Sequence, residues 1–177
     1  MDKETFLEIL PEYQKEAPVN LVQIANRLEL GIYSSSMLNP AISGKLIRIK
    51  TEESKKFDKG SGWYLLMNRD RPIGAIKECL AYLIAKFVIM DLEGFNLLSD
   101  SVRFRTKSTL NDPMEREINK LALEILLPNQ LLIEAIEEGK YIHELPALFK
   151  VDPSTLTAKL GYSVYPIDFW VNARSSH

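Results

Sequence analysis

Two apolar stretches of the chain carry the side chains whose types and spacing could do chemistry. Lys77 to Val88 contains Tyr82 and Lys86 four residues apart, and Met114 to Pro128 contains Glu115 near its start. On a helix, a spacing of four places Tyr82 and Lys86 on one face. A phenol, an ammonium and a carboxylate can form a hydrogen-bonded ion pair. They do not suit a hydrolytic zinc site, because Tyr is a poor zinc ligand at neutral pH and a protonated Lys repels a cation.

Few other reactive side chains stand beside these. Leu83, between Tyr82 and Lys86, accepts no proton, and the two histidines, His143 and His177, lie far from both stretches and from each other. The single cysteine, Cys79, is on an apolar helix and is predicted to be a small buried residue rather than a reactive thiol. The sequence contains no glycine-rich phosphate loop and no Ser–His–Asp arrangement. Catalytic residues and metal ligands are therefore not expected.

Both stretches are predicted to be helices, because their apolar residues recur at steps of three and four. The stripe of the first consists of Ile73, Ile76, Leu80, Leu83, Ile84 and Phe87, and that of the second of Ile118, Leu121, Ala122, Ile125 and Leu126. Asp112 and Pro113 are predicted to open the second helix. Glu115, three residues after Asp112, could complete a capping box, face the first helix, or do both.

The second stretch resembles a family signature, Glu-x-x-Ala-Asn-x-Phe-Ala-x-x-Leu-Leu-Met-Pro, of the ImmA/IrrE metallopeptidases. The matching residues are Glu115, Ile118, Asn119, Leu121, Ala122, Leu126, Leu127 and Pro128, with Ile118 and Leu121 as substitutions. The sequences PVNLVQIANRLEL at 18–30 and FKVDPSTLTAKLGY at 149–162 also resemble parts of that family. The resemblance thus covers roughly 18–162, and it implies that Glu115 stands where the family has its third zinc ligand.

The other two ligands in that family come from a helix with Leu-Ala-His-Glu-Leu-Gly-His-Tyr, and the best match here is 80–87. In that register Tyr82 and Lys86 replace the ligand histidines and Leu83 replaces the general base. A register one residue earlier would place Ala81, Tyr82 and Ala85 there, which suits zinc no better. The resemblance therefore implies a degenerate member, without metal or other cofactor, that has lost hydrolysis.

The resemblance implies an α+β fold, a mainly helical zincin-like domain with a small three-stranded antiparallel sheet and C-terminal helices. We predict a strand that starts at 32–33 and strands over 43–50 and 63–68. Helices are predicted over 3–15, interrupted near Pro11, over 18–30, capped by Asn20 and ended by Gly31, and over 129–140. The segment 142–162 is predicted to form a helix, a turn and a second helix. The segments 51–62 and 93–111 read as loops, the second with a basic edge. The domain is predicted to span 1–162, and the apolar tail 163–177 is expected to pack on it or on a second copy, which would make a homodimer.

Composition narrows the function classes. A chain of 177 residues with 46% hydrophobic residues suits one domain, and its net charge of −2 argues against a surface that coats nucleic acid. No secretory leader is expected from the opening residues, and the most apolar window, 79–90, is predicted to be too short for a membrane span. Lys159 is the only charge on 154–160, so these helices are predicted to be a packing unit rather than a DNA reader. A cytoplasmic protein without direct nucleic-acid or membrane contact is expected.

Three functions remain open from the sequence. The first is a noncatalytic protein that binds a partner, with Tyr82, Leu83, Lys86 and Glu115 as a vestigial pocket or partner-binding site. The resembled family often works beside helix-turn-helix repressors in phages and mobile elements, which implies a repressor as the partner. The second is a metalloprotease with an atypical site of carboxylates such as Glu78, Glu115 or Glu117. The third is a DNA-binding transcriptional regulator. Two orientations of Lys86 also remain open, toward Glu115 or toward water.

Overall fold

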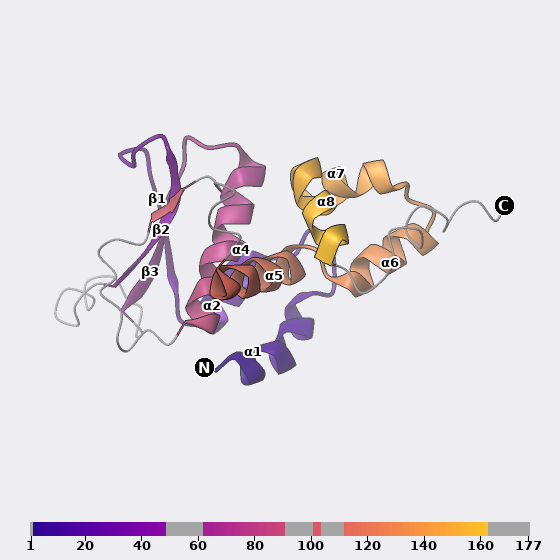
Figure 1. The fold of residues 1–177 in the computed structure, drawn as a ribbon, viewed down its shortest axis with the longest axis horizontal. Coiled ribbons are helices and arrows are strands. Elements are labelled where there is room, and N and C mark those ends of the chain that lie inside the picture. The colour runs from indigo at the N-terminus through magenta and orange to yellow at the C-terminus, as the bar shows by residue number, and fades with distance from the viewer. Residues whose placement is uncertain (1, 49–61, 91–100, 104–111, 163–177) are drawn as a thin grey trace.

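The computed structural model describes residues 2–48, 62–90, 101–103 and 112–162. The sheet lies at one end of the molecule, α4 and α5 lie beside it, and α6, α7 and α8 lie at the other end (Figure 1). The helices are α1 (Lys3–Ile9), η1 (Leu10–Tyr13), α2 (Leu21–Arg27), α4 (Ile73–Ile89), α5 (Pro113–Leu126), α6 (Asn129–Glu137), η5 (Ile142–Glu144), α7 (Leu145–Phe149) and α8 (Pro153–Tyr162). The strands are β1 (Gly31–Ser35), β2 (Ile42–Arg48), β3 (Trp63–Asn68) and β4 (Ser101–Arg103).

The sheet has the order β1-β3-β2-β4 and is mixed rather than antiparallel. Leu65 of β3 lies opposite Ile32 of β1 in a parallel pair and opposite Leu46 of β2 in an antiparallel pair. The mainly helical α+β fold is thus confirmed, but the expected antiparallel sheet is corrected. β2 runs back from β1, and β3, which is antiparallel to β2, inserts between the two and therefore runs parallel to β1. The short β4 adds a strand on the other side of β2.

The predicted caps are confirmed at two helix starts, and one predicted helix end is wrong. The Asn20 side chain accepts from the Gln23 amide at 3.3 Å, and the Asp112 side chain accepts from the Met114 amide at 2.9 Å. The expected stop at Gly31 is wrong. α2 ends at Arg27, and Glu29 adopts the left-handed conformation with φ 57°. Gly31 instead begins β1, where the ring of Tyr64 leaves no space for a Cβ.

The hydrophobic core joins the sheet to the α4–α5 pair. Core residues with 0% exposure include Leu46 and Leu65 from the sheet, Ala81, Leu83, Ile84 and Ala85 from α4, and Ile118 and Ile125 from α5. The Trp63 and Phe87 rings meet edge to face at 6.0 Å between centroids, which ties β3 to α4. Cys79 is buried as predicted, and its burial raises the pKa of its thiol to about 12. The thiol is therefore not ionised at neutral pH and is unreactive.

The C-terminal helices dock on α4 and α5 through specific polar contacts. The Lys77 ammonium donates to the Phe149 carbonyl at 3.0 Å, and the Glu78 carboxylate accepts from the Thr155 hydroxyl and from a backbone amide. Lys159 of α8 pairs with Glu124 of α5 and is only 4% exposed. Within the described part of α8, no basic side chain is therefore exposed, which agrees with a packing unit. None of the described helices is long and apolar enough to cross a membrane.

The predictions for 51–61, for most of 93–111 and for the tail 163–177 lie outside the described residues.

Candidate functional site

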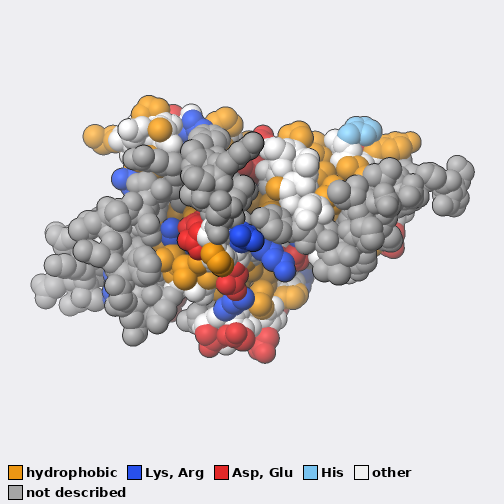
Figure 2. All heavy atoms as spheres, viewed as in Figure 1, with side chains coloured by type: hydrophobic (Ala, Val, Ile, Leu, Met, Phe, Trp, Pro, Cys, Tyr) orange, Lys and Arg blue, Asp and Glu red, His pale blue; other side chains and the backbone are white. Residues whose placement is uncertain are grey.

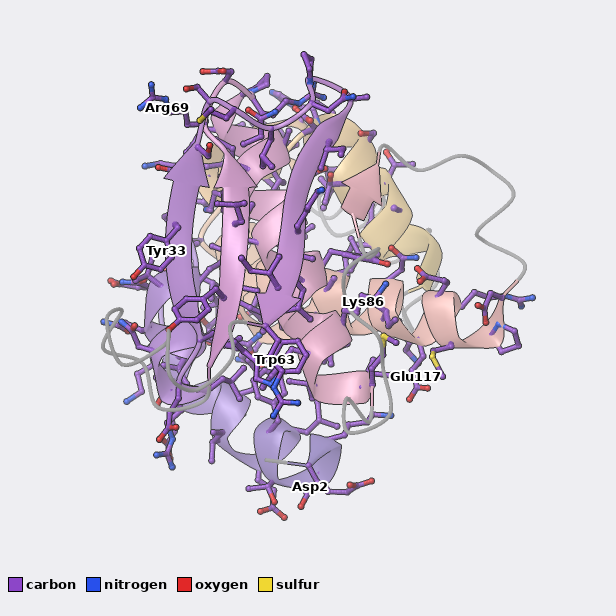
Figure 3. All side chains as sticks on the ribbon, turned by 90° about the vertical axis from the view of Figure 1, so that its left-hand side faces the viewer. Asp2, Tyr33, Trp63, Arg69, Lys86 and Glu117 are labelled. Atoms are coloured by element: carbon purple, nitrogen blue, oxygen red, sulfur yellow. The ribbon has the colours of Figure 1, made fainter. Side chains whose placement is uncertain are left out.

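The three polar residues singled out from the sequence meet between α4 and α5. The Tyr82 hydroxyl donates to Glu115 Oε2 at 2.7 Å, and Lys86 Nζ lies 3.8 Å from Glu115 Oε1. Lys86 Nζ also lies 5.8 Å from the centroid of the Tyr82 ring. The helical spacing of four and the first turn of α5 thus bring a phenol, an ammonium and a carboxylate together. In Figure 3, Lys86 lies among the helices to the right of the sheet, whereas Tyr33 lies at the left-hand edge of the sheet.

Lys86 is turned inward, toward Glu115, and not toward water. The whole residue is 8% exposed, and the Glu115 side chain is 22% exposed. A buried ammonium is tolerated when a charge and hydrogen bonds compensate for its lost hydration. The separation of 3.8 Å is that of an ion pair rather than a short hydrogen bond, so the direct hydrogen bond to the carboxylate comes from Tyr82.

Glu115 acts across the helix interface. The N-terminus of α5 is capped by Asp112 through the Met114 amide, while the Glu115 carboxylate is turned to Tyr82 and Lys86. The Glu115 carbonyl accepts from Asn119 Nδ2 at 2.7 Å. Asn119 belongs to the family signature, but the sequence alone does not predict a function for it. Asn119 is 3% exposed, and its Oδ1 has no hydrogen-bond partner among the described residues, so it is a buried polar neighbour of the site.

The side chains of 81–86 divide between the core and the site. Ala81 and Ala85 have 0% exposure and pack in the core, while Tyr82 and Lys86 face Glu115. Leu83 is fully buried in the hydrophobic core, so its side chain is not accessible to a partner in this conformation.

The residues at this site do not fit a zinc ion. Glu115 is the one carboxylate among them, and a protonated Lys86 repels a cation. Among the described residues no group of three or more His, Cys, Asp or Glu side chains could hold a metal. The carboxylates of the alternative metal site have separate partners, because Glu78 contacts Thr155 and Glu117 pairs with Lys3. Glu117 is labelled apart from Lys86 in Figure 3.

Tyr82→Phe is expected to lower the free energy of unfolding by about 1 kcal/mol, because it removes a hydrogen bond to a charged but partly solvated carboxylate. In a Glu115→Gln background the same change should cost clearly less. Denaturant unfolding of the four proteins of this double-mutant cycle measures the coupling between the two side chains. A coupling free energy near zero would show that the contact contributes nothing.

Comparison with known proteins gives one match. Residues 85–161 match the model of the Peptidase_M78 family, described as the IrrE N-terminal-like domain. No curated protein and no solved structure gives a significant match. The matched segment begins inside α4 and ends in α8, so it contains Lys86 and Glu115 but begins after Tyr82 and Leu83. The predicted resemblance is therefore confirmed over residues 85–161, which are similar to the IrrE N-terminal-like domain.

Proposed function

We propose that this protein is a noncatalytic relative of the ImmA/IrrE metallopeptidases and acts by binding another protein. The observation that carries the proposal is the inward-facing ion pair of Lys86 and Glu115 with the Tyr82 hydroxyl. Two of these side chains stand at positions that match the family's ligand histidines. The protein's own ammonium thus lies beside the carboxylate that matches the third ligand.

Hydrolysis of a peptide bond by a zinc peptidase requires a metal-bound water and a base that accepts its proton. The site offers a phenol and an ammonium where metal ligands would be needed. The residue matching the base is Leu83, an alkyl side chain with 0% exposure. These substitutions remove the metal ligands and the base, while the packed α4–α5 frame stays intact. A scaffold kept without its chemistry favours a role in binding.

The partner we propose is a protein, a helix-turn-helix repressor of a phage or mobile element, and the place of action is the cytoplasm. This rests on the family resemblance, since such repressors are the proteins beside which the family often works. The exposed face of α5 next to Glu115 is a suitable contact, because Met114 there is 46% exposed. Direct reading of DNA by α8 is not supported, because Lys159 is buried against Glu124.

The test combines metal content, cleavage and complex formation. We expect the purified protein to contain far less than one zinc per chain, to leave the repressor encoded beside it uncut, and to form a complex with it. Met114→Asp should weaken that complex, whereas Met37→Asp should not, because Met37 is 94% exposed but lies in the loop after β1. Stoichiometric zinc with cleavage, or salt-dependent DNA binding without a protein complex, would overturn the proposal.

A further inference from the structure

The backbone carbonyl of Glu124 cannot have its usual helical partner. In an α-helix this carbonyl accepts from the amide four residues later, and that residue is Pro128, which has no N–H. α5 ends at Leu126, so Glu124 belongs to the last turn, where carbonyls need donors from outside the helix. The side-chain amide of Gln14 provides one, because its Nε2 donates to the Glu124 carbonyl at 2.8 Å. Gln14 therefore replaces the N–H that Pro128 lacks.

Residues 3–14, called the N-terminal strap below, position this side-chain amide. Phe6 and Leu10 anchor the strap in the hydrophobic core, with exposures of 1% and 2%. Lys3 pairs with Glu117 of α5, about two helical turns before the contact of the amide. Figure 1 shows α1, in indigo, below α5. Acidic side chains gather over α1 at the lower margin of the molecule, so the outer face of the strap is at the surface (Figure 2).

Glu124 receives contacts from both the strap and α8. Its carbonyl accepts from Gln14, 110 residues away in the sequence, while its carboxylate pairs with Lys159, 35 residues away. Lys159 is 4% exposed, so its ammonium depends on the Glu124 carboxylate staying in place. If the carbonyl loses its donor, the last turn of α5 opens more readily, and this opening moves the carboxylate away from the buried ammonium.

We propose that the N-terminal strap closes the last turn of α5 through Gln14 and thereby controls the docking of α8. Gln14 is a positioning residue, because it acts on α8 through Glu124. Displacing the strap would open the last turn of α5, leave Lys159 without its partner and loosen α8. The inference is independent of the proposed function, because it concerns the opposite end of α5 from Glu115.

Native-state hydrogen exchange of the full chain tests the proposal. Gln14→Leu removes the donor and keeps a side chain of similar size. Relative to the amides of β3, those of α8 should exchange about tenfold faster than in the wild type. Gln23→Leu makes the same substitution at an exposed position of α2 and should leave this ratio unchanged. If Gln14→Leu left the ratio at its wild-type value, the proposal would be overturned.

Pro128→Ala shows whether Gln14 acts as a donor or only by packing. It restores a backbone N–H four residues after Glu124 and frees Leu127 from the restriction that a following proline imposes. In this background Gln14→Leu should change the exchange ratio by less than about twofold, because α5 then supplies its own donor. The thermal transition of each variant confirms folding. An equally large effect of Gln14→Leu in both backgrounds would also overturn the proposal.

Discussion

Glu124→Ala is expected to lower the free energy of unfolding by about 3 kcal/mol, while Lys159→Met should change it by less than about 1 kcal/mol. The two side chains form one ion pair between α5 and α8, but their exposures differ. The Lys159 side chain is 5% exposed and that of Glu124 is 38% exposed. Removing Glu124 leaves a buried ammonium without its negatively charged partner, whereas removing Lys159 leaves a carboxylate that water can solvate. The double variant should therefore resemble Lys159→Met.

Glu117→Ala provides a matched control on the same helix. Glu117 also pairs with a lysine of another helix, Lys3, but both side chains are exposed, at 48% and 38%. Exposed pairs contribute about 0–1 kcal/mol, so this variant should be nearly neutral. Thermal unfolding would show a drop of about 6–12 °C for Glu124→Ala and little change for the control. Equal losses from Glu124→Ala and Lys159→Met would contradict the asymmetry.

The pH dependence of stability should also reflect the burial of the Lys159 ammonium. Burial lowers the pKa of Lys159 below its usual 10.5, and the Glu124 carboxylate opposes this shift only in part. The unfolded chain then binds more protons than the folded chain between the lowered pKa and 10.5, so stability rises with pH across that window. Relative to Lys159→Met, the wild-type protein should gain stability as pH rises toward 10.5, and Glu124→Ala should gain more.

Lys86 and Lys159 show which side-chain contacts can be predicted from the sequence and which cannot. Lys86 interrupts an apolar stripe, and periodicity alone leaves open whether it points to water or to Glu115. The family register suggested Glu115 as its partner, and the structure supplies that contact. In the sequence, Lys159 stands out only as the single charge on 154–160. Its burial depends on Glu124, 35 residues earlier in the chain, and no local pattern encodes such a pairing.

The sheet shows the same division. The bounds of a strand can follow from its own residues, whereas its direction in the sheet depends on residues far away in the sequence. The apolar run at 63–68, which begins with two aromatic residues, predicted β3 with the bounds that the structure gives. The direction of β1 was not predictable from its own residues, because it is set by the insertion of β3 between β1 and β2. In the sequence, Asn119 is only one of the residues that match the family signature. Its contact with the Glu115 carbonyl follows from a helical turn and could have been proposed from spacing alone.

The variant carrying both Tyr82→His and Lys86→His is expected to bind one zinc ion per chain with a Kd at or below about 1 µM. Two imidazoles four residues apart on α4 would face Glu115, which already lies within 2.7 Å of the Tyr82 hydroxyl and 3.8 Å of the Lys86 ammonium. Replacing the phenol and the ammonium removes one weak ligand and one repelling charge. Two histidines and a carboxylate form a known three-ligand zinc set.

This gain of metal should come without a gain of hydrolysis. Leu83 still accepts no proton, and its burial in the core prevents a carboxylate from being introduced there without a large loss of stability. Zinc at about 100 times its Kd should stabilise the double variant by about 2.7 kcal/mol and leave the wild type unchanged. Adding Glu115→Gln, or restoring either single residue, should weaken zinc binding. Failure of the folded double variant to bind zinc would show that the α4–α5 frame no longer holds the spacing of a metal site, and that Tyr82, Lys86 and Glu115 adjoin for stability alone.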